Sequence, residues 1–492
     1  MKRGWLIGLV ALIGVVLAAP AMSADLSATG YMGIGYRAYQ NVGSWTDHVR
    51  TEWVQRFELF FHTAASKDLK GVVRLRMDSV PSPWGTNAEG RNALGKWGAE
   101  QVTVEVKEAY IDFKIPGIEC PTWLRAGVQF FALRPEVFLI AAGPGISFRS
   151  SVPLADGTFS LSGGWGKIRE YDEVITKTIY TCRGICDNIT WTCSCNVTTS
   201  IEKVEQQSAN LFYLAGDYKA KAGISGGLYV ALATGERKDY ATHKMDKGNI
   251  WWIGLYSDGK VGPVNYNFDL IYNTGKEDYR TAQDIKYSGW LARAVLTYPY
   301  EKFNFGLGGL YVSGVNYKKF DDKGKYTGFV LPIGSETMGP QADSLIVLSG
   351  WGTGPGIVGD IGWASVPWSQ AKITGSKFDL VRRGWPGIWG VRLFADYKAL
   401  NWLTLSGQVA YWGDTVKYGN AFEGPVLDKK YDDKDIGFEV DLGAKIDIYK
   451  NLAWRLVFGY LFAGNAADEK TAAGGKKYDD PYAFVSTLIY TF

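Results

Sequence analysis

The sequence has few of the residues that most often carry out chemistry. Only three of its 492 residues are histidines, at His48, His62 and His243. None of them lies in a recognisable catalytic motif, and an enzyme needs a nucleophile, a base and an orienting group within reach of one another. The Cys-x-x-Cys-His motif that attaches c-type haem is missing too. We therefore expect no enzymatic activity, no catalytic residue and no cofactor.

Long apolar runs and an excess of charge of one sign are also missing. After residue 24, no stretch approaches the roughly 18 uncharged apolar residues that a membrane-spanning helix needs. The chain has 53 Lys and Arg against 50 Asp and Glu, a formal net charge of +3. Proteins that bind nucleic acid usually show a strong basic excess. The sequence thus excludes a helical anchor and argues against a nucleic-acid partner.

The first 24 residues have the pattern of a secretory signal peptide. Lys2 and Arg3 precede an apolar run over residues 5–19, which is followed by the small-residue exit Pro20-Ala-Met-Ser-Ala24. A basic start, a short apolar segment and small residues at the cleavage site define such a peptide. We predict that residues 1–24 are removed and that residues 25–492 form the exported domain.

The chain has only five cysteines, and four of them are clustered within residues 182–195, at Cys182, Cys186, Cys193 and Cys195. In an exported protein such a cluster most simply forms two disulfides, here bracing one loop. A metal site is the alternative, although no histidine lies nearby to share the ligation. We expect disulfides and no metal. Cys120, near Pro116 and Pro121, is a candidate free thiol in a turn.

The last strand is the most informative segment that the chain does contain. Over residues 481–492, large and mostly aromatic side chains recur at a spacing of two on one face of the strand, and the chain ends on Phe492. They are Tyr482, Phe484, Leu488, Tyr490 and Phe492. A terminal aromatic residue on an alternating strand is typical of a closed sheet that meets lipid. The composition agrees, with 60 Gly, 29 Tyr, 23 Phe and 19 Trp at a mean hydropathy of only −0.10. An edge strand of a soluble protein is the alternative.

Alternation of apolar and polar residues continues through most of the chain, with short and long connectors in turn. Short connectors include residues 66–68, 156–157, 262–263 and 451–452, and long ones include residues 81–100, 171–208, 317–377, 420–435 and 466–480. This asymmetry of turns and loops is typical of outer-membrane barrels. We predict an all-β fold: a transmembrane antiparallel β-barrel of about 16–18 strands, with short periplasmic turns and long extracellular loops.

Charged residues occupy the face of the early strands that is predicted to point inward. A charge facing lipid would cost roughly 2–4 kcal/mol per arginine at the membrane midplane, whereas a water-filled lumen tolerates it. Near Lys107 and Glu108 the polar face changes parity, which predicts a β-bulge. These charges either form a wall that sieves solutes or pair with one another and fill the lumen. The candidate pore-lining residues on these strands are Arg56, Glu58, Arg74, Arg76, Asp78, Glu105 and Arg125.

Two connectors are candidates for folding against the barrel. Residues 134–145 are unusually apolar for a surface loop, so we expect them to pack on the inner wall or on a neighbouring subunit. Glu136 is the candidate acidic residue at a constriction. Residues 317–377 are too long and too rich in glycine and tryptophan for a simple loop, and either cover the mouth or enter the lumen.

Two segments carry a resemblance to a known family. Lys107-Glu-Ala-Tyr-Ile-Asp-Phe113, a short turn and Leu124-Arg-Ala-Gly-Val-Gln129 resemble the fourth and fifth strands of bacterial trimeric porins. The signal peptide, the meander of strands and Phe492 are similar to that superfamily over the whole chain, nearest to the outer membrane homotrimeric porins. The resemblance implies a trimer, an inward third loop bearing Glu136, and a facing arginine wall at Arg56, Arg74, Arg76 and Arg125.

The chain departs from that family in three ways. About 18 strands exceed the 16 usual in general porins, the third loop lacks an acidic cluster, and the cysteine loop is unexpected. Eighteen strands fit substrate-specific porins better. In such a channel Tyr110, Phe131 and Trp412 are candidates to stack on sugar faces.

The function expected from the sequence is a passive channel for small hydrophilic solutes in the outer membrane of a Gram-negative bacterium. Its expected partners are membrane lipid, two further copies of the chain and the barrel-assembly machinery, which would read Phe492 as a C-terminal signal. Three alternatives remain open: a substrate-specific sugar or organic-acid channel, a structural sheath around an electron-transfer partner, and a soluble exported β-protein.

Overall fold

The computed structural model describes most of the chain. The described residues are 25–41, 49–78, 104–135, 137–182, 195–238, 245–279, 283–332, 344, 347, 381–382, 387–420, 424–425, 433–467 and 479–492. The predicted signal peptide, Glu136, Cys186 and Cys193 lie outside these residues. No helix in the described part is long and apolar enough to cross a membrane.

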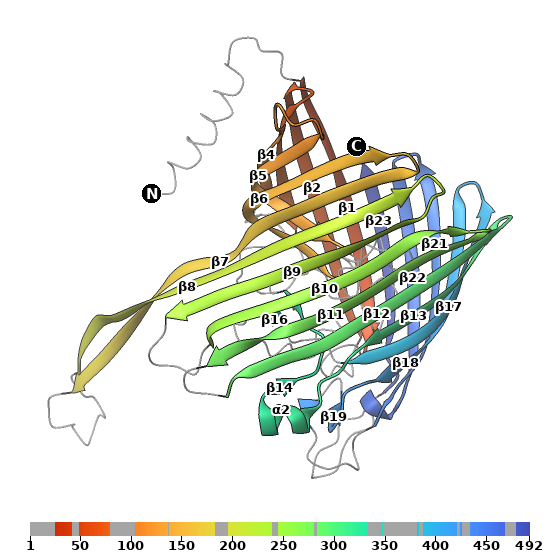
Figure 1. Cartoon of the computed structure of the whole chain (residues 1–492). Helices are drawn as coiled ribbons and strands as arrows, with labels where there is room; N and C mark the ends of the chain where they lie inside the picture. The colour runs from red at the N-terminus through yellow and green to blue at the C-terminus, as the bar shows by residue number, and fades with distance from the viewer. Residues whose placement is uncertain are drawn as a thin grey trace.

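One large sheet dominates the structure (Figure 1). Across the described residues it contains 18 long strands and the two-residue strand β14. The long strands are β1 (Asp25–Gln40), β2 (Arg50–Ser66), β3 (Leu69–Asp78), β4 (Val104–Lys114), β5 (Thr122–Leu133), β6 (Leu139–Leu154), β7 (Gly157–Cys182), β8 (Cys195–Ala220), β9 (Ser225–Lys238), β10 (Met245–Val261), β11 (Val264–Tyr279), β12 (Ile285–Tyr300), β13 (Phe303–Val312), β17 (Ile388–Leu400), β18 (Leu403–Asp414), β21 (Asp435–Tyr449), β22 (Leu452–Ala463) and β23 (Tyr482–Thr491).

The remaining elements are short. They are α2 (Tyr317–Lys323), β14 (Lys325–Tyr326), β15 (Leu331–Pro332), β16 (Val381–Arg382), β19 (Gly419–Asn420), β20 (Gly424–Pro425) and the 3₁₀ helix η5 (Asn465–Ala467).

The long strands form a closed antiparallel meander. Each pairs with the long strand before and after it in the chain, and β23 pairs with β1 from Tyr31↔Thr491 to Gln40↔Tyr482. At the seam, the Phe492 N–H donates to the Gly30 carbonyl at 3.0 Å and the Gly30 N–H donates back at 2.9 Å. The Phe492 ring also stacks on Phe57, with 6.2 Å between ring centroids. The predicted barrel is confirmed, with 18 strands.

The two ends of the barrel differ as the sequence predicted. Tight connections such as residues 155–156, 262–263, 301–302 and 401–402 lie at one end, together with the C-terminus (Figure 1). Longer connections, including residues 313–387 between β13 and β17, lie at the other end. In outer-membrane barrels the short turns face the periplasm and the long loops face outward. By this comparison, the end with the short turns and the C-terminus is the periplasmic end, and the end with the long connections faces outward.

The strands bury alternate side chains, and the exposed set is apolar. On β10, Ile250 and Trp252 are fully buried, whereas Trp251, Ile253 and Leu255 are 42–50 % exposed. A water-soluble protein rarely leaves so many large apolar side chains exposed in one contiguous surface. An outward apolar band with an inward polar face is the design of a barrel that sits in lipid. The chain is therefore built for the outer membrane.

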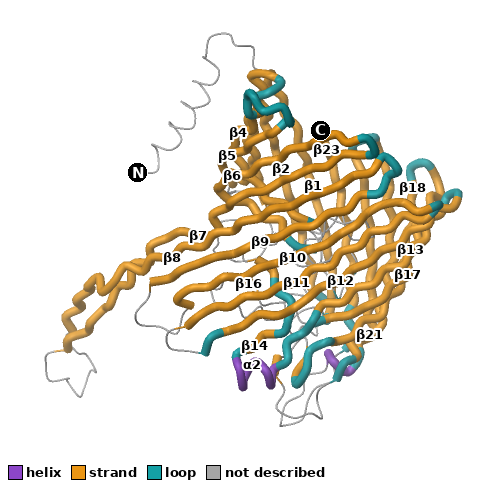
Figure 2. The backbone as a smooth tube through the Cα atoms, in the orientation of Figure 1, coloured by secondary structure: helices purple, strands orange, loops and turns teal. Residues whose placement is uncertain are grey.

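Two local features correct or confirm the sequence prediction. Residues 171–208 were predicted as a loop, but the β7–β8 ladder continues to Cys182↔Cys195, which face each other in register. The resulting hairpin projects well beyond the barrel (Figure 2). Backbone pairing can extend a polar strand in which apolar and polar residues alternate only weakly, so the sequence pattern does not reveal this hairpin.

The predicted bulge is confirmed, because Arg74 pairs with Glu108 and Leu75 with Val106, which leaves Lys107 as the extra residue.

Candidate functional site: the inner face of the barrel

One hairpin leaves the barrel wall. β5 and β6 pair from Thr122↔Ser150 to Leu133↔Leu139. However, β4 pairs with β5 only up to Val128, and β7 pairs with β6 only from Gly145. Residues 129–144 are thus held by their own ladder and by neither neighbouring strand. The sequence prediction of a loop over residues 134–145 is partly wrong, because β6 already begins at Leu139.

The tip of this hairpin reaches strands that lie far away in sequence. Arg134 places its guanidinium group between Asp258 of β10 and Asp269 of β11, with N–O distances of 2.7 Å and 2.5 Å. Two further hydrogen bonds, at 2.8 Å to Asp269 and 3.2 Å to Asp258, make both contacts bidentate. The guanidinium carbon also lies 4.4 Å from the centroid of the Tyr256 ring. The contact spans more than 120 positions in the sequence and anchors the tip on the inner face of β10 and β11.

The environment of Arg134 keeps it charged. Burial of the guanidinium group opposes its charge, and the four hydrogen bonds to Asp269 and Asp258 offset that cost. The Arg134 backbone has a φ of 46°, a left-handed conformation that is uncommon for residues other than glycine. We infer that the turn is shaped by this anchor, since strained backbone persists where surrounding contacts determine it.

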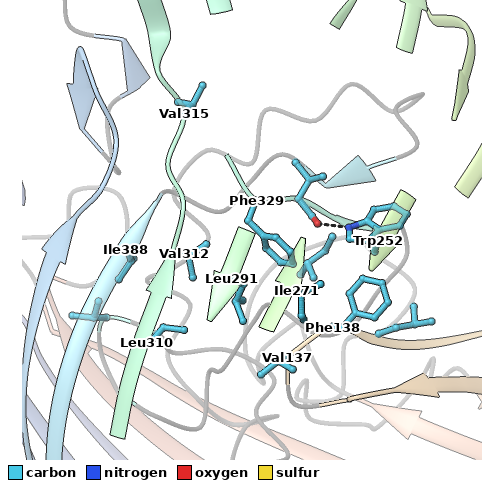
Figure 3. Close-up of a cluster of buried hydrophobic side chains, with 14 of the residues drawn as sticks. Val137, Phe138, Trp252, Ile271, Leu291, Leu310, Val312, Val315, Phe329 and Ile388 are labelled. Carbon is cyan, nitrogen blue, oxygen red and sulfur yellow. Dashed lines mark hydrogen bonds between the residues drawn. The ribbon is translucent and has the colours of Figure 1, made fainter. Parts of the chain in front are cut away.

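Next to Arg134, the tip packs through apolar side chains. Val137 and Phe138 are fully buried. The Phe138 ring lies 5.7 Å from the ring of Trp252 on β10 (Figure 3). It also lies 5.3 Å from the ring of Tyr229 on β9. Of the two placements expected for this apolar segment, the inner wall or a neighbouring subunit, Val137 and Phe138 take the inner wall.

A second segment enters the same region from the long connector. Phe329, Val330 and Leu331 are buried, and the Trp252 indole N–H donates to the Val330 carbonyl at 2.8 Å (Figure 3). The Val330 N–H donates to the side-chain carbonyl of Asn273 at 3.2 Å. Of the two placements considered for residues 317–377, entry into the lumen holds for residues 329–331.

Across from these contacts, β2, β3 and β4 carry a ladder of ion pairs. Arg74 donates to Glu58 at 2.8 Å from Nε and to Glu108 at 2.9 Å. Arg76 donates to the other oxygen of Glu58 at 2.5 Å, and Glu58 itself is fully buried. The Arg74 guanidinium also lies within 5 Å of the Phe60 and Phe130 ring centroids, at 4.8 and 4.7 Å.

The ladder continues onto β5 and β6. Asp112 accepts hydrogen bonds from Arg125 at 3.0 Å and from Arg149 at 2.8 Å. The Arg125 guanidinium carbon lies 4.0 Å from the Tyr110 ring centroid. Four arginines therefore share the three carboxylates of Glu58, Glu108 and Asp112. Pairing among these seven side chains is extensive, and the arginines outnumber the carboxylates by one.

The other predicted residues fall as follows. Arg56 is buried at 6 % exposure, and the backbone of Asp78 lies directly opposite it. Glu105 lies opposite Arg76, its side chain is 44 % exposed, and it forms an ion pair with Lys107 at 3.7 Å. Sequence analysis missed Arg134, Asp258 and Asp269, because only the folded-in hairpin brings them together. No group of three or more His, Cys, Asp or Glu in the described part of the chain could hold a metal ion.

The aromatic residues considered for sugar stacking have little free surface. Phe131 is 3 % exposed and Trp412 is 1 % exposed, with its indole N–H bound to Glu439 at 2.9 Å. Tyr110 is covered by Arg125. Phe131 and Trp412 therefore offer no open stacking platform, whereas Tyr110 is partly exposed.

Comparison with known proteins connects this barrel to a set of solved structures. The outer membrane protein OprD from Pseudomonas aeruginosa matches with a TM-score of 0.50 and 14 % identity, over 96 % of this chain and 95 % of that one. OccK5 (OpdH) and OpdK from the same organism match with TM-scores of 0.48 and 0.47, each at 12 % identity, over 95 % of this chain and 98 % and 99 % of theirs. No family model matches the sequence. No curated protein matches it either.

At such low identity the likeness establishes the fold. The chain has the architecture of an outer-membrane porin: a closed 18-strand antiparallel barrel in the outer membrane of a Gram-negative bacterium.

Proposed function

We propose that the protein is a passive outer-membrane channel for small hydrophilic solutes, with a preference for anions. The observation that carries this proposal is the β5–β6 tip, which Arg134 fastens to Asp258 and Asp269 inside the barrel. A loop folded into a barrel of this size narrows an otherwise wide aqueous lumen. Selectivity is then decided by the charged groups beside the narrow section.

The preference for anions follows from the charges on the two walls. The β2–β6 wall carries four arginines against the three carboxylates that they contact. Opposite it, Arg134 is surrounded by Asp258 and Asp269. A positive wall facing an acidic one creates a transverse field, and the solute concentrates along the wall of opposite sign. We expect Arg74 and Arg125, whose side chains are 14 % and 24 % exposed, to line the solute path. The buried side chains of Arg56, Arg76 and Glu58 support them.

A selective channel is favoured over an unselective one. The inserted tip and residues 329–331 bury a cluster of large apolar side chains on the inner face of β9–β12. The remaining path runs beside the arginines, so a solute carrying a carboxylate or phosphate group has the best complementary partner. The same obstruction disfavours a sheath around a redox protein, which would need a wide lumen. A trimer, and recognition of Phe492 by the assembly machinery, remain expectations of this proposal.

Liposome swelling tests this function. Liposomes that contain the purified protein are expected to swell in small sugars and in organic acids, faster for the acids at equal size. Protein-free liposomes and liposomes with heat-denatured protein are the controls. Absence of swelling with every small solute, from protein that keeps its folded mobility on unheated gels, would contradict an open channel.

A further inference from the structure

The outer face of β12 shows where the membrane lies. Going from the short turn, its outward residues are Tyr300, Tyr298, Leu296, Ala294, Ala292 and Trp290. Tyr300 and Trp290 are ten positions apart, which on a tilted strand is about 25 Å, the height of the apolar band in such barrels. Tyr300 therefore marks the periplasmic aromatic girdle and Trp290 the extracellular one.

A lysine lies four positions beyond the extracellular aromatic residue on each of three neighbouring strands. The pairs are Lys247 and Trp251 on β10, Lys276 and Tyr272 on β11, and Lys286 and Trp290 on β12. Four residues span about 13 Å along a strand, which on the same tilted strand is about 10 Å of height. This distance places the ammonium groups outside the apolar band, at the level where lipid headgroups lie.

Lys276, Lys286 and Lys325 form a row in which, among the described residues, only Lys276 has an acidic partner. Lys276 lies directly opposite Lys286, and Lys286 is paired with Lys325 of β14 (Figure 1). Like charges directly opposite each other across strands are destabilising. Asp278 is paired with Lys276 at 2.9 Å and with Lys247 at 4.0 Å. Among the described residues, no ion pair involves Lys286 or Lys325, so the row attracts an external anion.

An apolar groove begins directly below this row. Trp290 and Tyr311 stack at 4.3 Å, and beneath them small residues line a depression of about 550 Å³ on the outer face. Ala294 pairs with Gly309, and Gly309 pairs with Val391. A side-chain carbon added at Gly309 would meet nothing within 4 Å. The lining includes Phe268, Ala292, Ala294, Gly309, Tyr311 and Trp389.

We propose that this surface is a binding site for a phosphorylated lipid of the outer leaflet. Its phosphate contacts Lys276, Lys286 and Lys325, and an acyl chain lies in the groove over Gly309. Charge complementarity selects the lipid over a second copy of the chain, because a headgroup phosphate relieves the repulsion in the lysine row. The stacked pair of Trp290 and Tyr311 lies between the phosphate contact and the acyl-chain contact. Interfacial aromatic residues of membrane proteins take this position, at the level of the headgroups. The site is on the outside of the barrel and is independent of the proposed channel function.

Native mass spectrometry of the detergent-solubilised full-length protein tests the site. The probe is purified lipid A, a bisphosphorylated glycolipid, compared with its dephosphorylated form. Lys276→Gln/Lys286→Gln/Lys325→Gln is expected to weaken binding of the phosphorylated form by about 100-fold, at about fivefold per basic residue. Gly309→Leu places a side chain in the groove, where its first carbon meets nothing within 4 Å, and is expected to weaken binding of both lipid forms. Lys219→Gln/Lys221→Gln/Lys302→Gln, at the periplasmic end, is the matched control.

Each result decides the proposal. A loss restricted to the extracellular triple variant, together with preference for the phosphorylated lipid, supports it. Equal binding of the two lipid forms, or equal losses in both triple variants, overturns it. A Gly309→Leu protein that changes its number of subunits while it keeps its lipid affinity shows that the groove is a subunit contact, which overturns the acyl-chain part. None of these variants is expected to change the channel conductance, because the altered residues lie on the outside of the barrel.

Discussion

Reversing the charge of Arg134 is expected to open the channel. In Arg134→Glu, a third carboxylate faces Asp258 and Asp269 in the place of their bidentate partner. Like charges brought together in a desolvated contact cost several kcal/mol. The tip of the β5–β6 hairpin has no backbone pairing with β4 or β7 to keep it in place. The tip is therefore expelled, and single-channel conductance in a planar bilayer rises roughly twofold because conductance depends on the narrowest section.

Two variants control for this effect. Arg134→Glu/Asp269→Arg restores opposite charges at the same contact and is expected to return the conductance toward that of the unmodified protein. Arg134→Lys keeps the charge and should change the conductance little, although it loses the bidentate geometry. An Arg134→Glu barrel that is correctly folded and conducts like the unmodified protein would show that the tip does not limit the pore.

Removing two arginines from the opposite wall is expected to reverse ion selectivity. Arg74→Gln/Arg76→Gln deletes two cations and leaves Glu58 without the arginine partners that hold it in a fully buried position. The field of this wall then becomes acidic. Local ion concentrations in charged clefts vary by an order of magnitude or more, so the ratio of anion to cation permeability should fall roughly tenfold. The measurement is the reversal potential under a potassium chloride gradient.

A charge-neutral variant provides the matched control. Glu58→Gln/Arg74→Gln removes one carboxylate and one cation from the same contact, so the net charge of the wall is unchanged. Its reversal potential should stay near that of the unmodified protein. Truncating one partner of a buried pair is costly, about 3–5 kcal/mol, so the unfolding temperature of both variants is measured alongside. Identical reversal potentials in the two variants would mean that the wall does not face the solute.

Most of the fold could be predicted from the sequence because a transmembrane barrel repeats one simple pattern. Lipid outside and polar groups inside force alternation along every strand, and turn chemistry marks one end. The bulge at Lys107 was visible for the same reason, since one extra residue changes the parity of the polar face. The length of the β7–β8 hairpin was not visible, because beyond the membrane no lipid face constrains its side chains.

The inner wall was predictable only in part. Arg74 and Arg76 stand out because arginine on an alternating strand has to avoid lipid. Their partners are on adjacent strands, so the ladder with Glu58 follows from the meander. Arg134 pairs with Asp258 and Asp269 through a fold of the hairpin across the barrel, and no local pattern encodes such a contact. The insertion of residues 329–331 is hidden in the same way.

The most direct test of an anion-preferring channel is a bilayer recording of the unmodified protein under a salt gradient. Purified full-length protein is inserted into a planar bilayer with unequal potassium chloride on the two sides, and conductance and reversal potential are read together. We predict stable unitary openings and a reversal potential of the sign that indicates chloride preference. Inserted, folded protein that conducts no current, or that prefers potassium, would contradict the account.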